Sequence, residues 1–150
     1  MRPELEQAMC HRVYPITKRI AIGQFATPDR AYYLLENGYT HVLNVSEAAS
    51  VIHPSENGVR QVTDHRLDDL VRIPDETALR CLNTLHEMLQ AEGSRVYLHC
   101  IACRNRSPTI LWLYLLACGL EDNAAESLIT ERCPDAVPGH RDLVDDQLLE

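Results

Sequence analysis

Short apolar segments alternate with helical patterns along this chain of 150 residues, and this alternation restricts its fold more than any other feature. The strand-like segments are 19–23, 41–45, 61–67 and 95–99. Helical patterns occupy 28–37, 75–92 and 106–117, and two more follow at 122–132 and 140–149. Strands that alternate with helices are typical of parallel sheets with helical crossovers. The sequence therefore predicts an α/β fold in a single domain, 1–150, with a central, largely parallel sheet of about 4–5 strands flanked by helices. Residues 1–17 are expected to be an N-terminal extension at the edge of this domain.

Composition and charge exclude several classes of function. The longest apolar run, 110–118, has nine residues, whereas a membrane span needs roughly 18, so we expect a buried helix and no membrane partner. The chain has 14 Lys plus Arg against 22 Asp plus Glu, a net charge of −8. Binding to nucleic acid depends on neutralising phosphates, so an acidic chain is a poor candidate for it. Any anion would have to be bound by a local pocket.

Six cysteines raise the question of disulfides. The residues from Met1 to Glu6 include no apolar stretch of the kind that a secretory signal has. A chain of this length can also build a core without covalent crosslinks. We therefore expect a cytoplasmic protein whose cysteines are reduced thiols.

The loop between the strand 95–99 and the next helix is the place where chemistry is expected. Ligands of parallel sheets bind at the carboxyl ends of the strands. A short loop there directs successive backbone N–H groups inward, at the positive end of the following helix, and so forms a cradle for an anion. Arg106, at the start of this helix, can bind two phosphate oxygens with its planar guanidinium.

Cys100 lies at the other end of this cradle. A helix N-terminus and a nearby arginine both favour the thiolate form of a cysteine. A thiolate against a bound phosphate can attack phosphorus in line, giving a cysteinyl-phosphate that water then hydrolyses. Ser107 can donate a hydrogen bond to the sulfur when it leaves in the second step.

Cys100, five residues and Arg106, with His99 before and Ser107 after, resemble the protein tyrosine phosphatase superfamily. Three further segments are similar to its small, atypical dual-specificity branch: 38–45, 67–69 and 123–139. The resemblance covers about residues 18 to 145. It implies a dual-specificity phosphatase-like fold and hydrolysis of phosphate monoesters, above all phosphotyrosine, with phosphoserine and phosphothreonine as further candidates.

The resemblance also implies a role for each site residue. Cys100 would be the nucleophile, Arg106 would bind phosphate and stabilise the transition state, and Ser107 would assist breakdown of the intermediate. His99 would support the loop from behind. The backbone amides that hold the phosphate would be those of Ile101, Ala102, Cys103, Arg104, Asn105 and Arg106. No metal and no cofactor is implied, and the partner would be a phosphorylated protein or a small phosphate monoester.

The resemblance places the general acid at Asp68 or Asp69. This group must protonate the leaving oxygen, so it must face the cradle from a neighbouring loop. If the strand extends to Leu67 and that residue points inward, Asp69 follows two positions later on the same side. We therefore favour Asp69 and keep Asp68 as the alternative.

Cys103 departs from the family pattern, which usually has glycine there. A Cβ at this position either strains the cradle or occupies backbone angles that any residue can adopt. Cys100 and Cys103 also form a CxxC pair, which admits a redox protein or half of a metal site. A further alternative to an active phosphatase is a catalytically weak pseudophosphatase that only binds phosphate. In an active enzyme, oxidised Cys100 could form a protective disulfide with Cys103.

Overall fold

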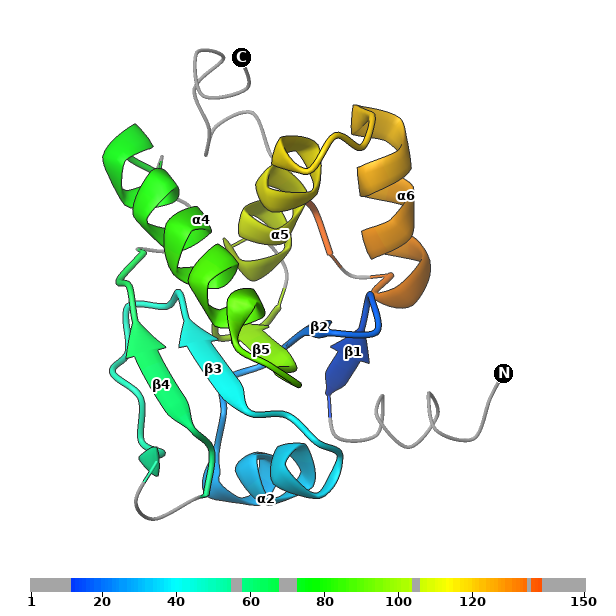
Figure 1. The fold of residues 1–150 in the computed structure, drawn as a ribbon. Helices are drawn as coiled ribbons and strands as arrows, with labels where there is room; N and C mark the ends of the chain where they lie inside the picture. The colour runs from blue at the N-terminus through cyan, green and yellow to red at the C-terminus, as the bar shows by residue number, and fades with distance from the viewer. Residues whose placement is uncertain (1–11, 55–57, 68–72, 104–105, 135, 139–150) are drawn as a thin grey trace.

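The predicted strands join in one sheet in the computed structural model, which describes residues 12–54, 58–67, 73–103, 106–134 and 136–138. The sheet has five strands in the order β1-β2-β5-β3-β4 (Figure 1). They are β1 (Val13–Pro15), β2 (Ile20–Gly23), β3 (His41–Asn44), β4 (Gln61–Asp64) and β5 (Val96–His99). Only β1 runs antiparallel to its neighbour, and β5 lies between β2 and β3. The predicted fold class is therefore confirmed.

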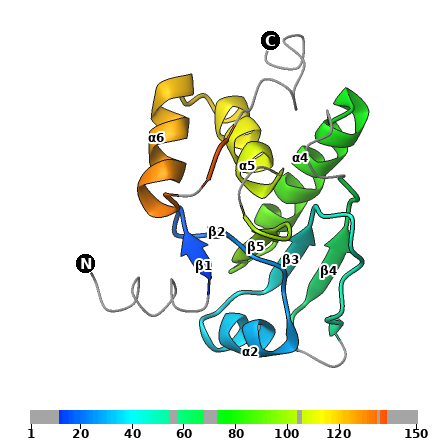
Figure 2. The same ribbon diagram turned by 180° about the vertical axis from the view of Figure 1, so that it is seen from behind.

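Helices cover both faces of this sheet. They are α2 (Pro28–Glu36), α4 (Asp75–Gln90), α5 (Arg106–Ala117) and α6 (Asp122–Arg132). Helix α2 lies on one face, and α4, α5 and α6 lie on the other (Figures 1 and 2). No helix in the described part of the chain has the length and apolar character that crossing a membrane requires.

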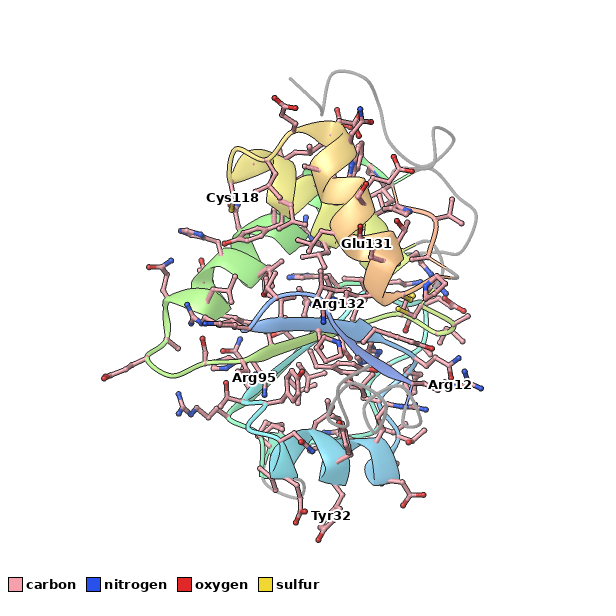
Figure 3. All side chains as sticks on the ribbon, turned by 90° about the vertical axis from the view of Figure 1, so that its right-hand side faces the viewer. Arg12, Tyr32, Arg95, Cys118, Glu131 and Arg132 are labelled. Atoms are coloured by element: carbon pink, nitrogen blue, oxygen red, sulfur yellow. The ribbon has the colours of Figure 1, made fainter. Side chains whose placement is uncertain are left out.

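Side chains that alternate along the strands divide the interior into two cores. In β5, Val96 and Leu98 point to the helices α4 and α5, while Tyr97 points to α2. The same alternation separates Val42 from Leu43 in β3. Figure 3 shows the sheet edge-on between these two layers. Because both faces are covered, the central strands are buried along their whole length, as parallel sheets require.

Four expectations need comment. The strand predicted for 61–67 ends at Asp64, so the alternation that placed Asp69 on the side of Leu67 does not hold. Strand β1 was not predicted; it lies within the N-terminal segment 1–17, which was expected at the edge. The helix predicted for 140–149 falls outside the described residues. Assignment of residues 1–150 to one phosphatase domain stays a prediction.

The strand register brings four residues into one row at the carboxyl edge of the sheet. Gly23 pairs with His99, His99 with Asn44, and Asn44 with Asp64. Gly23 has no room for a side chain, because a Cβ would lie 2.2 Å from Tyr97 Oη and 2.4 Å from the Arg12 carbonyl oxygen. This row is the base on which the loop after β5 is built.

Two arginines brace the opposite, amino edge of the sheet. Arg95 donates to the carbonyl oxygens of Lys18 (3.0 Å) and Asn37 (2.6 Å) and lies over the ring of Tyr39. Arg19 donates to Leu89 O and to both the carbonyl and the hydroxyl of Ser94. In Figure 3 the labelled Arg95 lies at this edge, away from Arg12. Their forked guanidinium groups thus satisfy backbone carbonyls rather than a ligand.

His99 ends β5 in a closed aromatic environment. The ring of Tyr97 stacks on it at 5.5 Å between centroids, and Phe25 meets its edge at 5.2 Å. Its Nδ1 lies 3.1 Å from the Cys100 carbonyl oxygen, which identifies Nδ1 as the protonated nitrogen. No described residue hydrogen-bonds to the buried Nε2. A second proton would therefore place an unpaired charge in the interior, and burial lowers the pKa of His99 from 6.5 to about 4.

We expect this buried imidazole to make the fold acid-sensitive. Between pH 6.5 and 4 the unfolded chain binds a proton at His99 that the folded chain excludes. The free energy of unfolding therefore decreases as the pH is lowered through this range. The contribution of His99 should be about 2 kcal/mol between pH 7 and pH 5, measured as the free energy of unfolding in urea. His41 and His65, whose pKa values burial also lowers, add in the same direction. The variant His99→Gln should show a smaller pH dependence, and the exposed control His86→Gln an unchanged one; equal dependence in all three proteins would contradict this account.

Candidate active site

The loop that begins at Cys100 is held by the strands on both sides of β5. The Val45 N–H donates to the His99 carbonyl oxygen at 2.8 Å, and the Phe25 N–H donates to that of Ile101 at 3.1 Å. These bonds come from the segments that follow β3 and β2, respectively. The loop then leads into α5, which lies over β5 (Figure 2). Its start is therefore fixed by main-chain bonds before any side chain is considered.

Cys100, Arg106 and Ser107 lie together where this loop meets α5. All three side chains are buried, Cys100 to 1% exposure. The Cys100 Sγ lies 3.3 Å from the Ser107 Oγ. Ser107 belongs to the first turn of α5, so its hydroxyl can donate to the sulfur whenever the sulfur carries a negative charge. Ile101 and Ala102, the next two residues of the predicted cradle, are exposed.

Arg106 has its guanidinium inside the protein, at 3% exposure. Its Nη1 donates to the Leu67 carbonyl oxygen at 3.0 Å and forms an ion pair with the Glu47 carboxylate. The backbone N–H of Glu47 and the Arg106 guanidinium both lower the pKa of Glu47, which keeps it ionised. One nitrogen of the guanidinium, Nη1, is thus held by two acceptors, which orient the group.

The loop that carries Glu47 is itself braced by polar side chains at the ends of β3 and β4. The buried Asn44 donates to the Ala48 carbonyl oxygen (2.7 Å) and to Asp64 Oδ1 (3.3 Å). Ser46 donates to Asn44 Oδ1 at 2.6 Å, and the Ser50 N–H donates to Asp64 Oδ2 at 3.1 Å. This network determines where Glu47 can reach. Glu47 was not among the predicted site residues, although its position just after a buried strand, at the carboxyl edge, was an available signal.

Cys103 is the described residue of the cradle whose backbone departs most from ordinary geometry. Its φ is +57°, in the left-handed region where a Cβ costs about 1–2 kcal/mol and glycine does not. The sequence left open whether a Cβ at this position strains the cradle or occupies backbone angles that any residue can adopt. The positive φ shows that it strains the cradle. The buried Cys103 Sγ accepts from the Ser107 Oγ at 3.8 Å and lies 3.9 Å from the Cys133 Sγ. Contact with the Cys133 thiol and burial hold the pKa of Cys103 well above its usual value.

Four predicted site residues fall outside the described residues: Asp68, Asp69, Arg104 and Asn105. Their roles stay predictions. Leu67, the described residue before the two aspartates, is buried, and its carbonyl contacts Arg106. Within the described ranges, no three histidine, cysteine, aspartate or glutamate side chains gather closely enough to hold a metal ion.

Comparison with known proteins gives matches of structure but not of sequence. No protein-family model and no curated protein matches the chain. Tk-PTP in its active form overlaps with a TM-score of 0.75 at 21% identity, over 87% of this chain and 90% of that one. PTPMT1 in complex with PI(5)P gives 0.75 at 19% identity, over 92% of both chains. The human tyrosine phosphatase-like serine/threonine/tyrosine-interacting protein gives 0.74 at 19% identity, over 91% of this chain and 92% of its own.

These three overlaps extend over 87–92% of this chain. The resemblance noted in the sequence is thereby confirmed at the level of the fold. The chain therefore has the fold of these solved structures, a small dual-specificity phosphatase-like α/β fold.

Proposed function

We propose that this protein is a cysteine-dependent phosphatase that hydrolyses phosphate monoesters. One observation carries the proposal: the Cys100 sulfur lies 3.3 Å from the Ser107 hydroxyl, beside Arg106 at the start of a buried helix. A nucleophile, a donor for its leaving form and a cation for the phosphate are thus held where the loop meets α5. This combination serves covalent phosphoryl transfer through sulfur.

In the first step, Arg106 and the loop amides bind the phosphate oxygens. The Cys100 thiolate attacks phosphorus, the P–S bond forms and the P–O bond to the leaving group breaks. Asp69, or Asp68 in its place, gives its proton to the leaving oxygen. Leu67 contacts Arg106 and directly precedes these aspartates in the chain, which supports an acid from this segment.

In the second step, water attacks the cysteinyl-phosphate. The aspartate, now ionised, takes a proton from the water, the P–S bond breaks and inorganic phosphate leaves. The Ser107 hydroxyl donates to the Cys100 sulfur as negative charge returns to it. The hydrogen bond stabilises the leaving thiolate, so Ser107 acts mainly on this step.

The proposed substrate is phosphotyrosine, with phosphoserine and phosphothreonine as further candidates. A phosphorylated protein or a small monoester would be the partner, and the net charge of −8 argues against nucleic acid. One structural neighbour was solved with PI(5)P, so a phosphoinositide belongs in the panel of compounds to be tested. The described cysteines are all thiols, which fits a reducing compartment such as the cytoplasm.

A second candidate function is phosphate binding without turnover. The strained backbone at Cys103 favours it, because a distorted cradle can bind an anion yet hold it poorly for attack. A structural neighbour is described as phosphatase-like rather than as a phosphatase. The two functions differ in one measurable property, which is turnover.

The first test is hydrolysis of an aryl phosphate by the wild type and by Cys100→Ser. We expect turnover in the wild type and a loss of at least about 10⁴-fold in the variant, because a serine hydroxyl remains protonated and attacks poorly. The control Cys118→Ser changes an exposed thiol in the same manner and should leave turnover intact. A wild type that binds phosphotyrosine peptides without hydrolysing them would favour the binding function instead.

The general acid can be identified from the pH profile of kcat/KM. We expect a bell whose acidic limb reports formation of the Cys100 thiolate and whose basic limb reports loss of the aspartate proton. Asp69→Asn should lower turnover by about 10²- to 10⁴-fold and flatten the basic limb. If Asp68→Asn has this effect and Asp69→Asn does not, the assignment passes to Asp68.

Glu47 should act as a positioning residue for Arg106. Glu47→Gln keeps the size of the side chain but removes the ion pair, so we expect a rise in KM and in the inhibition constant of inorganic phosphate, of about tenfold, with a smaller change in kcat. Glu76→Gln removes an exposed glutamate–arginine pair on α4 and serves as the matched control. Unchanged phosphate inhibition in Glu47→Gln would show that Arg106 is oriented without it.

A further inference from the structure

A cavity outside the proposed active site lies at the amino edge of the sheet. Its volume is about 420 Å³, which is within the range of roughly 300–1,000 Å³ that small-molecule sites occupy. Three segments form its walls. Residues 17–20 contribute where the chain enters β2, α4 contributes Leu89 and Gln90, and α5 contributes Tyr114 and Leu115.

This cavity and the phosphate cradle lie at opposite ends of α5. The helix starts at Arg106, in the proposed active site, and reaches the cavity at Leu115, about 13–14 Å further on at 1.5 Å for each residue. In Figure 3, Cys118, which directly follows α5, lies on the same side of the molecule as Arg95, at the amino edge of the sheet. A small ligand in this cavity therefore does not reach the cradle.

Part of the cavity wall is apolar. Ile20 and Leu115 are buried, and Leu89 and the ring of Tyr114 are half-buried. An apolar ligand that covers such a wall leaves water, which increases its affinity by about fourfold for each methylene group buried. The wall thus favours a ligand with an aliphatic chain.

The charged side chains at the cavity are cationic. Lys18 is the only lysine of the chain, and within the described residues its exposed ammonium has neither a hydrogen-bond nor an ion-pair partner. Arg19 donates to the carbonyl oxygens of Leu89 and Ala91, so it offsets the negative end of α4, which would otherwise repel an anion. None of the 22 acidic residues is among the described residues that line the cavity. The cavity is therefore positive in a protein whose net charge is −8.

Neutral polar groups complete one side of the cavity. The Gln90 Nε2 lies 3.5 Å from the His86 Nε2, and the His86 Nδ1 lies 3.4 Å from the Tyr114 Oη. Burial, together with the neighbouring Cys118, raises the pKa of Tyr114, so its hydroxyl keeps its proton at neutral pH. Gln90 and Tyr114 thus bring N–H and O–H groups to the same cavity as Lys18.

We propose that this cavity binds a small amphiphile with an aliphatic chain and one anionic head group, of which a medium-chain carboxylate is the simplest example. The chain lies against Ile20, Leu89 and Leu115. The head group pairs with the Lys18 ammonium, beside the Arg19 guanidinium. Because no residue that lines the cavity takes part in the proposed phosphatase reaction, this site does not depend on the proposed function.

The first test is equilibrium dialysis of the full-length protein with compounds that share a decyl chain: decanoate, decanol and decyltrimethylammonium, each below its micelle concentration. We expect saturable binding of decanoate, about fivefold tighter than that of decanol, and the weakest binding for the ammonium compound. Octanoate, two methylene groups shorter, should bind about 15-fold more weakly than decanoate. Equal binding of decanoate and decanol would overturn the anionic class of ligand, and absence of saturable binding would overturn the site.

Variants test the location of the ligand. Lys18→Gln should weaken decanoate binding about fivefold and leave decanol binding unchanged, whereas Arg80→Gln, at an exposed arginine on α4 outside the cavity, should change neither. Leu89→Ser should weaken the binding of both compounds, and Leu79→Ser, at an exposed leucine of the same helix, should not. If Lys18→Gln and Leu89→Ser bind both compounds as the wild type does, the ligand lies elsewhere and the assignment is wrong.

The cradle also attracts anions, so a competition experiment has to separate the two sites. Saturating inorganic phosphate, compared with sodium chloride at equal ionic strength, should leave decanoate binding unchanged. Displacement by phosphate alone would show that decanoate binds in the cradle and would overturn the separate site. Decanoate binding by a protein without phosphatase activity would refute the proposed function and support the cavity; phosphatase activity without decanoate binding would do the reverse.

Discussion

The buried guanidinium of Arg106 is the constraint on which the rest of the site depends. A cation at 3% exposure is destabilising unless acceptors surround it, and two of these come from distant segments, the Leu67 carbonyl and the Glu47 carboxylate. Glu47 in turn is placed by the loop that Asn44 and Asp64 brace at the ends of β3 and β4. The start of α5 and the ends of two parallel strands are thus tied together through one side chain.

The order of the helices and strands was predictable because local patterns determine it. Thr27 caps α2 with its hydroxyl, Pro28 begins that helix, and the apolar spacing of α4 places Ala78, Leu85 and Met88 on its buried face. The place of β5 between β2 and β3 was not predictable, since periodicity carries no information about which strands are neighbours. Strand β4 was predicted three residues too long, because its exposed residues give no clear sign of where pairing stops.

The same distinction applies to the site. Cys100, Arg106 and Ser107 were predictable as a group because chain connectivity alone keeps them close. Glu47 and Cys133 reach the cradle only through the tertiary fold, so no spacing rule identifies them. Arginine by itself is no sign of phosphate recognition, because Arg19 and Arg95 bind main-chain carbonyls at the far edge of the sheet.

The central position of β5 has a consequence for the order in which the protein is made. Strands β1 and β2 form one pair and β3 and β4 another, and in the sheet only β5 joins them. A chain is synthesised from its N-terminus, so both pairs emerge from the ribosome before β5 does. Until then β2 and β3 each present an open edge of the kind that recruits other strands. The cradle follows β5 directly, so it forms only when the last strand has closed the sheet.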